Sequence, residues 1–148
     1  MIHKSFDEMT GKGEASTDTF RLHENKVWLT PTDYLDLTPS VVVTEQGEKV
    51  GWFVFTAYFS DWMFQHDEHM YALIDGKRLQ VQGISTYSDT REDRDEIMCI
   101  EIMQMQVELE WMGTVAKCES AKIRVLGLDF ELTADMRSQI GLLVDAMS

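Results

Sequence analysis

Hydrophobic and polar positions in the middle of the chain follow the period of two that is typical of β-strands. Val41–Val43 is a β-branched run, Gly47 marks a turn, and Val50–Phe59 is a long aromatic strand. This second strand is apolar on both faces, because Phe53 lies on one parity and Trp52 on the other. A strand that faced water on one side would alternate apolar with polar residues. We therefore expect both faces to be covered, either within the domain or by another subunit.

A second hairpin is predicted farther along the chain. The strand-like runs Met70–Ile74 and Arg78–Val81 flank the pair Asp75-Gly76. An Asp-Gly pair in this position predicts a type I′ turn, because both central residues of that turn adopt positive φ. Beyond the hairpin, Ser88–Asp95 is predicted to be a charged loop and Ile97–Ile102 another strand.

Residues 103–111 fit two patterns. Their apolar positions alternate like a strand, with a parity opposite to that of the preceding run, which a β-bulge would allow. Val107, Trp111 and Val115 instead recur at helical spacing. We favour a helix over Val107–Lys117, despite the cost of Gly113 in its interior.

The end of the chain has a clearer pattern. Ala121–Val125 and Leu128–Leu132 predict a hairpin that turns at Gly127, and Thr133 is the expected N-cap of a final helix. The apolar stripe of this helix consists of Met136, Ile140, Leu143, Val144 and Met147. Such a helix is expected to lie across a sheet.

The start of the chain is mostly polar, so residues 1–25 are expected to form a flexible or irregular N-terminal arm. Asp33–Leu37 is predicted to be a short helical turn capped by Thr32. Residues 26–148 are expected to form a single α+β domain. Its mostly antiparallel sheet of about six to eight strands, in a sandwich or open barrel, would carry the C-terminal helix and a second helix.

Composition limits the possible partners. With 148 residues and 44% hydrophobic content, the chain is long enough to bury one core. Its formal net charge of −13 argues against nucleic-acid binding and, since no basic run exists, against an anionic membrane surface. The same negative field would steer encounters with a basic protein partner.

Two cysteines, Cys99 and Cys118, are too few for a disulfide framework and are expected to be reduced, buried thiols. The first residues do not resemble a secretory signal, and the apolar runs are too short to span a bilayer. These features predict a cytoplasmic protein.

The strongest chemical candidate is the segment 66–69, in which His66 and His69 are separated by Asp67 and Glu68. Two histidines three apart can ligate zinc, but two ligands do not complete a site, and a polar loop is the alternative interpretation. No nucleophile elbow or glycine-rich phosphate loop is present, so no cofactor is predicted and nothing in the sequence supports catalysis. A metal-dependent hydrolase that uses both histidines is the weakest functional alternative.

Aromatic and methionine side chains are abundant, and such residues are favoured at protein interfaces and in adaptable pockets, although they also fill ordinary cores. The interface or pocket candidates are Trp52, Phe53, Phe55, Tyr58, Phe59, Trp62, Phe64 and Met70. We therefore expect a non-catalytic, homodimeric protein-interaction module of the small acidic adaptor, inhibitor or immunity type. The alternative is a domain that binds an apolar small molecule, with Tyr58 or Gln82 as the orienting group.

Overall fold

The computed structural model describes residues 1–27, 30–65 and 67–148. Its first sheet consists of β1 (His3–Phe6), β2 (Gly13–Ser16), β3 (Phe20–Val27), β4 (Thr30–Val43), β5 (Lys49–Phe59), β8 (Ile84–Asp93) and β9 (Glu96–Val107). Its second sheet consists of β6 (His69–Ile74), β7 (Lys77–Gln82), β10 (Ala121–Val125) and β11 (Leu128–Glu131). The helices are α1 (Leu109–Lys117) and α2 (Ala134–Ala146).

Among the described residues, the larger sheet has seven strands in the order β1-β2-β4-β5-β9-β8, and β3 pairs with β4 beside β2. The smaller sheet has four strands in the order β11-β10-β6-β7. All the pairings are antiparallel, and neither sheet closes into a barrel. The predicted class, an α+β fold with a mostly antiparallel sheet and a C-terminal helix, is therefore confirmed.

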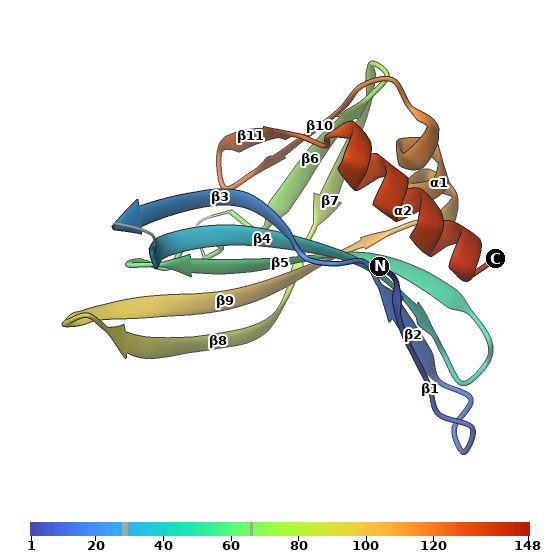
Figure 1. Cartoon of the computed structure of the whole chain (residues 1–148), viewed down its shortest axis with the longest axis horizontal. Helices are drawn as coiled ribbons and strands as arrows, with labels where there is room; N and C mark the ends of the chain where they lie inside the picture. Colours follow the sequence, from blue (N-terminus) through green and yellow to red (C-terminus); the bar gives the residue numbers. More distant parts are fainter. Residues whose placement is uncertain (28–29, 66) are drawn as a thin grey trace.

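Both helices and the four-stranded sheet lie on one side of the seven-stranded sheet (Figure 1). On that inner side, Phe53, Phe55 and Ala57 of β5 are completely buried. The small sheet contributes Met70, Ala72, Ile74, Ala121, Ile123 and Val125 to the same core. The helices contribute Met112, Val115, Ile140 and Leu143. The core therefore lies between the layers, as burial of the apolar face of each element requires.

The predicted turns at Asp75-Gly76 and Gly127 form as the sequence indicates. Asp75 and Gly76 have φ of 47° and 82°, as a type I′ turn requires. Leu126 and Gly127, between β10 and β11, have φ of 58° and 72°. Thr133 caps α2 as predicted, because its hydroxyl accepts a hydrogen bond from the Met136 backbone N–H at 3.3 Å.

Two glycine-to-alanine substitutions are expected to change stability in opposite directions. Gly76→Ala should lower the free energy of unfolding by about 1 kcal/mol, because its φ of 82° is unfavourable for alanine although the space around it is open. Gly113→Ala should raise it by about 1 kcal/mol, because Gly113 lies inside α1 and the nearest atom to an added Cβ is 4.0 Å away. Urea unfolding followed by circular dichroism measures both changes. Shifts of the same sign in the two variants would contradict this interpretation.

The ambiguous segment 103–111 is divided between the two predicted structures. β9 continues to Val107 and α1 begins at Leu109, so the predicted helix is present but starts two residues later than expected. β9 pairs with β5 without interruption from Cys99 to Val107, and the irregularity lies in β8, between Ser85 and Tyr87. The change of apolar parity thus requires no bulge in β9.

Three predictions of irregular or helical structure are wrong. Residues 1–25, which were expected to form an irregular arm, contain β1, β2 and most of β3. The expected helical turn at Asp33–Leu37 is part of β4. Most of the expected loop Ser88–Asp95 belongs to β8. The side chains of β1 are all exposed, as are nearly all those of β8. Their stability as strands comes from backbone pairing with a neighbour, which leaves no hydrophobic pattern in the sequence.

Cys99 and Cys118 are free and buried, as expected. Burial raises the pKa of both thiols above the ordinary value, so the neutral form is favoured. Neither of the helices that the structure describes is long and apolar enough to cross a membrane.

Candidate binding surfaces

Most of the predicted interface residues belong to the core. Phe53, Phe55, Phe59, Phe64 and Met70 are at most 9% exposed and pack within the hydrophobic cluster between the layers. A partner could not contact these side chains without unfolding the domain. They therefore contribute to packing within the chain, and the aromatic content by itself does not locate a surface.

Trp52 lies on the opposite face of β5 and remains half-buried. Its neighbours on this outer face of the sheet are Ser40 of β4 and Gln106 of β9, which stand directly opposite it in the register. Val50 and Val54 flank it along the strand and are also half-buried. Half of the two-sided apolar strand therefore faces outward, away from the helices and the small sheet.

Among the residues that the structure describes, no charged side chain lies within the surface around Trp52. We define the Trp52 face as the outward residues Thr38, Ser40 and Val42 of β4; Val50, Trp52, Val54 and Thr56 of β5; Ile84 and Tyr87 of β8; and Ile102, Gln104 and Gln106 of β9. Ile84 and Tyr87 are 56% and 45% exposed. Charges begin only at its borders, for example at Glu14 beside Val42 and at Asp36 beside Thr56. In a chain with 26% charged residues, this is an unusual concentration of neutral side chains.

Tyr58 closes one end of the Trp52 face. Its ring stacks on Tyr34 with the centroids 5.1 Å apart, and its hydroxyl donates a hydrogen bond of 2.8 Å to Asp93. The Arg21 guanidinium lies 4.2 Å from the centre of the Tyr34 ring. Desolvation, followed by the bond to Asp93, raises the pKa of Tyr58. With only 6% of its surface exposed, Tyr58 is a structural link between β4, β5 and β8.

The loop after β5 is held by a buried carboxylate. Glu101 of β9 is 3% exposed and accepts hydrogen bonds from the backbone N–H groups of Met63, at 2.7 Å, and Phe64, at 3.2 Å. These bonds place the Phe64 ring in the core beside Phe55. Trp62, another predicted interface residue, lies half-buried in this loop. The sequence gives no signal for the role of Glu101, because an acidic residue in an apolar strand predicts an exposed position.

The predicted metal motif can be placed only in part. The ring of His69 lies 3.4 Å from the carboxylate of Asp67, measured from Nδ1 to Oδ1, whereas His66 lies outside the described residues. Among the residues that are described, no three or more histidine, cysteine, aspartate or glutamate side chains are grouped as metal ligands would be. A site that uses both His66 and His69 stays a prediction.

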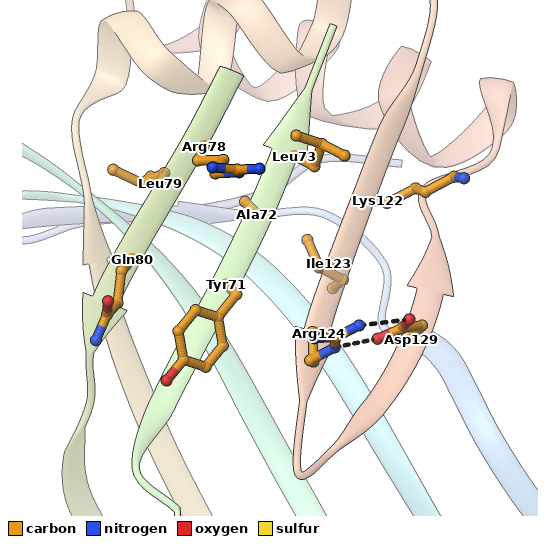
Figure 2. A pocket seen from close by; sticks show the side chains of 10 residues that line it. All are labelled: Tyr71, Ala72, Leu73, Arg78, Leu79, Gln80, Lys122, Ile123, Arg124 and Asp129. Atoms are coloured by element: carbon orange, nitrogen blue, oxygen red, sulfur yellow. Dashed lines mark hydrogen bonds and ion pairs between the residues drawn. The ribbon is translucent and has the colours of Figure 1, made fainter. Parts of the chain in front are cut away.

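A shallow depression of about 500 Å³ lies on the small sheet (Figure 2), whereas the Trp52 face belongs to the larger sheet. Its outward-facing rows cross β7, β6 and β10: Leu73 stands between Arg78 and Lys122, and Tyr71 stands between Gln80 and Arg124. Tyr71 and Leu73 are 40% and 41% exposed. Alternation along β10 predicts that its basic residues point outward, but only the strand register brings Arg78 beside them.

One of the three cations is already paired. Arg124 forms a two-point contact with Asp129, with nitrogen–oxygen distances of 2.5 and 3.0 Å. This contact holds the pKa of Asp129 below its ordinary value. The side chains of Arg78 and Lys122 make no hydrogen bond or ion pair with the residues that the structure describes.

Comparison with known proteins identifies no relative of this chain: no family model, no curated protein and no solved structure matches it.

Proposed function

We propose that the protein is a non-catalytic interaction module that self-associates through the Trp52 face. The observation that carries the proposal is the absence of charge from this face on a chain of net charge −13. The centres of protein interfaces are depleted in charged residues and enriched in aromatic ones. A half-buried tryptophan at the centre of a neutral patch is also the kind of residue that contributes most to binding energy.

Electrostatics restricts where a second copy of the chain can dock, and the Trp52 face is the surface that it penalises least. Two copies that each carry a net charge of −13 repel one another at most orientations. The repulsion is smallest where neutral faces meet and the charges lie at the rim, where water and salt screen them. Sheet faces also pack on one another about 10 Å apart in β-sandwiches, so the geometry is a common one. A two-fold axis near Trp52 would bury the same residues of both copies.

Trp52→Ala is expected to weaken the dimer by more than about tenfold. Loss of a tryptophan at the centre of an interface typically costs about 2 kcal/mol of binding free energy or more. Sedimentation velocity over a concentration series measures the dissociation constant. Leu142→Ala is the matched control, because Leu142 is 51% exposed on α2 and lies away from the face. A wild-type chain that stays monomeric up to about 100 μM would overturn the proposal.

A second pair of variants guards against a folding defect in the tryptophan variant. Gln106→Glu adds one charge to the Trp52 face without changing side-chain size, and Gln65→Glu adds the same charge in an exposed loop. Only Gln106→Glu should weaken self-association, and its effect should shrink as salt is added. Equal effects of the two substitutions would assign the change to net charge and not to the face.

The alternative function predicted from the sequence, a pocket lined by aromatic and methionine residues, has less support. Five of the eight residues that would form it are packed against one another in the core. The depression on the small sheet is lined instead by strand residues, with several basic groups.

A further inference from the structure

The depression on the small sheet combines features that the Trp52 face lacks. Tyr71 and Leu73 expose apolar surface at its floor, and Arg78 and Lys122 stand on either side of Leu73 in the same cross-strand row. Because these two cations lie two strands apart, their backbones are separated by about 10 Å. Figure 2 shows the Arg78 side chain reaching from β7 toward β6, over the depression.

Arg78 and Lys122 belong to the several described cations whose side chains form no ion pair, a group that also includes Lys49, Lys77 and Arg91. Acidic residues outnumber basic ones by 26 to 13, so a lysine or arginine has many carboxylates available for pairing. Arg124, in the neighbouring row, is neutralised by Asp129. Within the described part of the chain, the side chains of Arg78 and Lys122 form no such ion pair, although Lys122 stands opposite Glu131 in the β10–β11 register.

The chemistry of the lining defines the ligand class. A guanidinium presents paired donors that match the oxygens of a carboxylate, and a lysine ammonium binds an anion as a point charge. The ring of Tyr71 and the side chain of Leu73 provide apolar contact between and beside the cations. A volume of about 500 Å³ lies within the range of small-molecule sites.

We propose that this depression binds a small organic dianion, with a flat apolar body on Tyr71 and Leu73 and one carboxylate at each of Arg78 and Lys122. The proposal is independent of self-association, since the site is on the other sheet. The proposed ligand is complementary in charge to the site, although the chain as a whole is acidic. Its binding would therefore become weaker as salt is added.

The test uses the full-length chain and naphthalene-2,6-dicarboxylate, whose two carboxylates project from opposite ends of a flat ring system. Isothermal titration calorimetry gives the affinity, and shifts of backbone amide resonances in β6, β7 and β10 locate the binding. 2-Naphthoate, with one carboxylate, should bind about tenfold more weakly, and the neutral dimethyl ester weaker still, because each lost anion removes a charge-assisted contact.

Variants assign the binding to the two cations. Arg78→Gln and Lys122→Gln should each reduce affinity for the dicarboxylate by about tenfold or more, and should reduce affinity for the neutral ester little. Lys77→Gln is the matched control, since it removes a positive charge from an exposed residue of the same strand that does not line the depression. Thermal unfolding of each variant verifies that the fold is intact.

Several results would overturn the proposal. The first is that the dicarboxylate does not bind at about 10 mM, the weak limit of specific association. The second is that the dicarboxylate and the ester bind with equal affinity. The third is that Lys77→Gln reduces the affinity for the dicarboxylate as much as Arg78→Gln and Lys122→Gln do. A further such result is that a polyglutamate peptide binds and shifts the resonances of the same strands, whereas the dicarboxylate does not bind. The ligand would then be an acidic peptide, and the proposal of a small organic dianion would be rejected.

Discussion

Replacing Glu101 by alanine is expected to lower the free energy of unfolding by about 3 kcal/mol. The carboxylate is 3% exposed and accepts the backbone N–H groups of Met63 and Phe64. Its removal leaves these two donors without their acceptor, and each buried unsatisfied donor costs about 1–3 kcal/mol. Phe64 is 1% exposed, so release of the loop would also loosen a core ring.

Urea unfolding followed by tryptophan fluorescence measures this effect. Glu96→Ala is the control on the same strand, because Glu96 is exposed, and its replacement should change stability by no more than about 0.5 kcal/mol. Glu101→Gln should fall between wild type and Glu101→Ala, since the amide oxygen can accept one of the two N–H groups. A Glu101→Ala variant as stable as the Glu96 control would show that the loop does not depend on this carboxylate.

Replacing Gly51 by alanine is expected to cost about 3 kcal/mol, at the upper end of the range for overpacking. An added Cβ would lie 2.7 Å from the backbone oxygen of Val107 and 2.7 Å from the sulfur of Met112. The Val107 oxygen belongs to the strand paired with Gly51, so it cannot move without disturbing the β5–β9 ladder. The Met112 sulfur of α1 is the flexible end of a side chain and can shift, so the contact with the Val107 oxygen accounts for most of the cost.

Gly83→Ala provides a comparison with equally short contacts of a different kind. There the added Cβ would lie 2.6 Å from the sulfur of Met103 and 2.7 Å from that of Met105. These thioethers are flexible ends of side chains, so the expected cost is smaller, about 1 kcal/mol. Chemical unfolding of the two variants in parallel gives the difference. A Gly83 variant less stable than the Gly51 variant would contradict the assumption that backbone contacts resist more than methionine side chains.

Strands that carry their own hydrophobic pattern were predictable, and strands that do not were missed. β5, β6, β10 and the hairpin turns follow from alternation and from residues suited to positive φ. β1 and β8 are edge strands with mostly polar, exposed side chains. Each pairs with the next strand along the chain, β1 with β2 and β8 with β9, through backbone hydrogen bonds that leave no side-chain periodicity in the sequence.

The candidate surfaces illustrate the same division at the level of single residues. The sequence identified Trp52 as one of eight candidates. It could not show whether Trp52 or Phe53 faces outward, because both are aromatic and they lie on opposite faces of the strand. Only the position of the helices and of the small sheet determines which parity becomes core. Likewise, Arg78 and Lys122 are 44 positions apart by their numbers, and the β6–β7 and β6–β10 registers bring them to either side of Leu73.

Local patterns in the chain thus established the fold class, the tight turns, the cap of the last helix and a two-sided apolar strand in the middle. These features depend on interactions between residues close in sequence, or on burial that a periodic pattern records directly. The strand order, the neutral Trp52 face, the Glu101 anchor and the dibasic depression depended on the packing of distant segments. They arise because strand pairing places residues beside one another without regard to their separation along the chain, and because the layers cover only one face of each sheet.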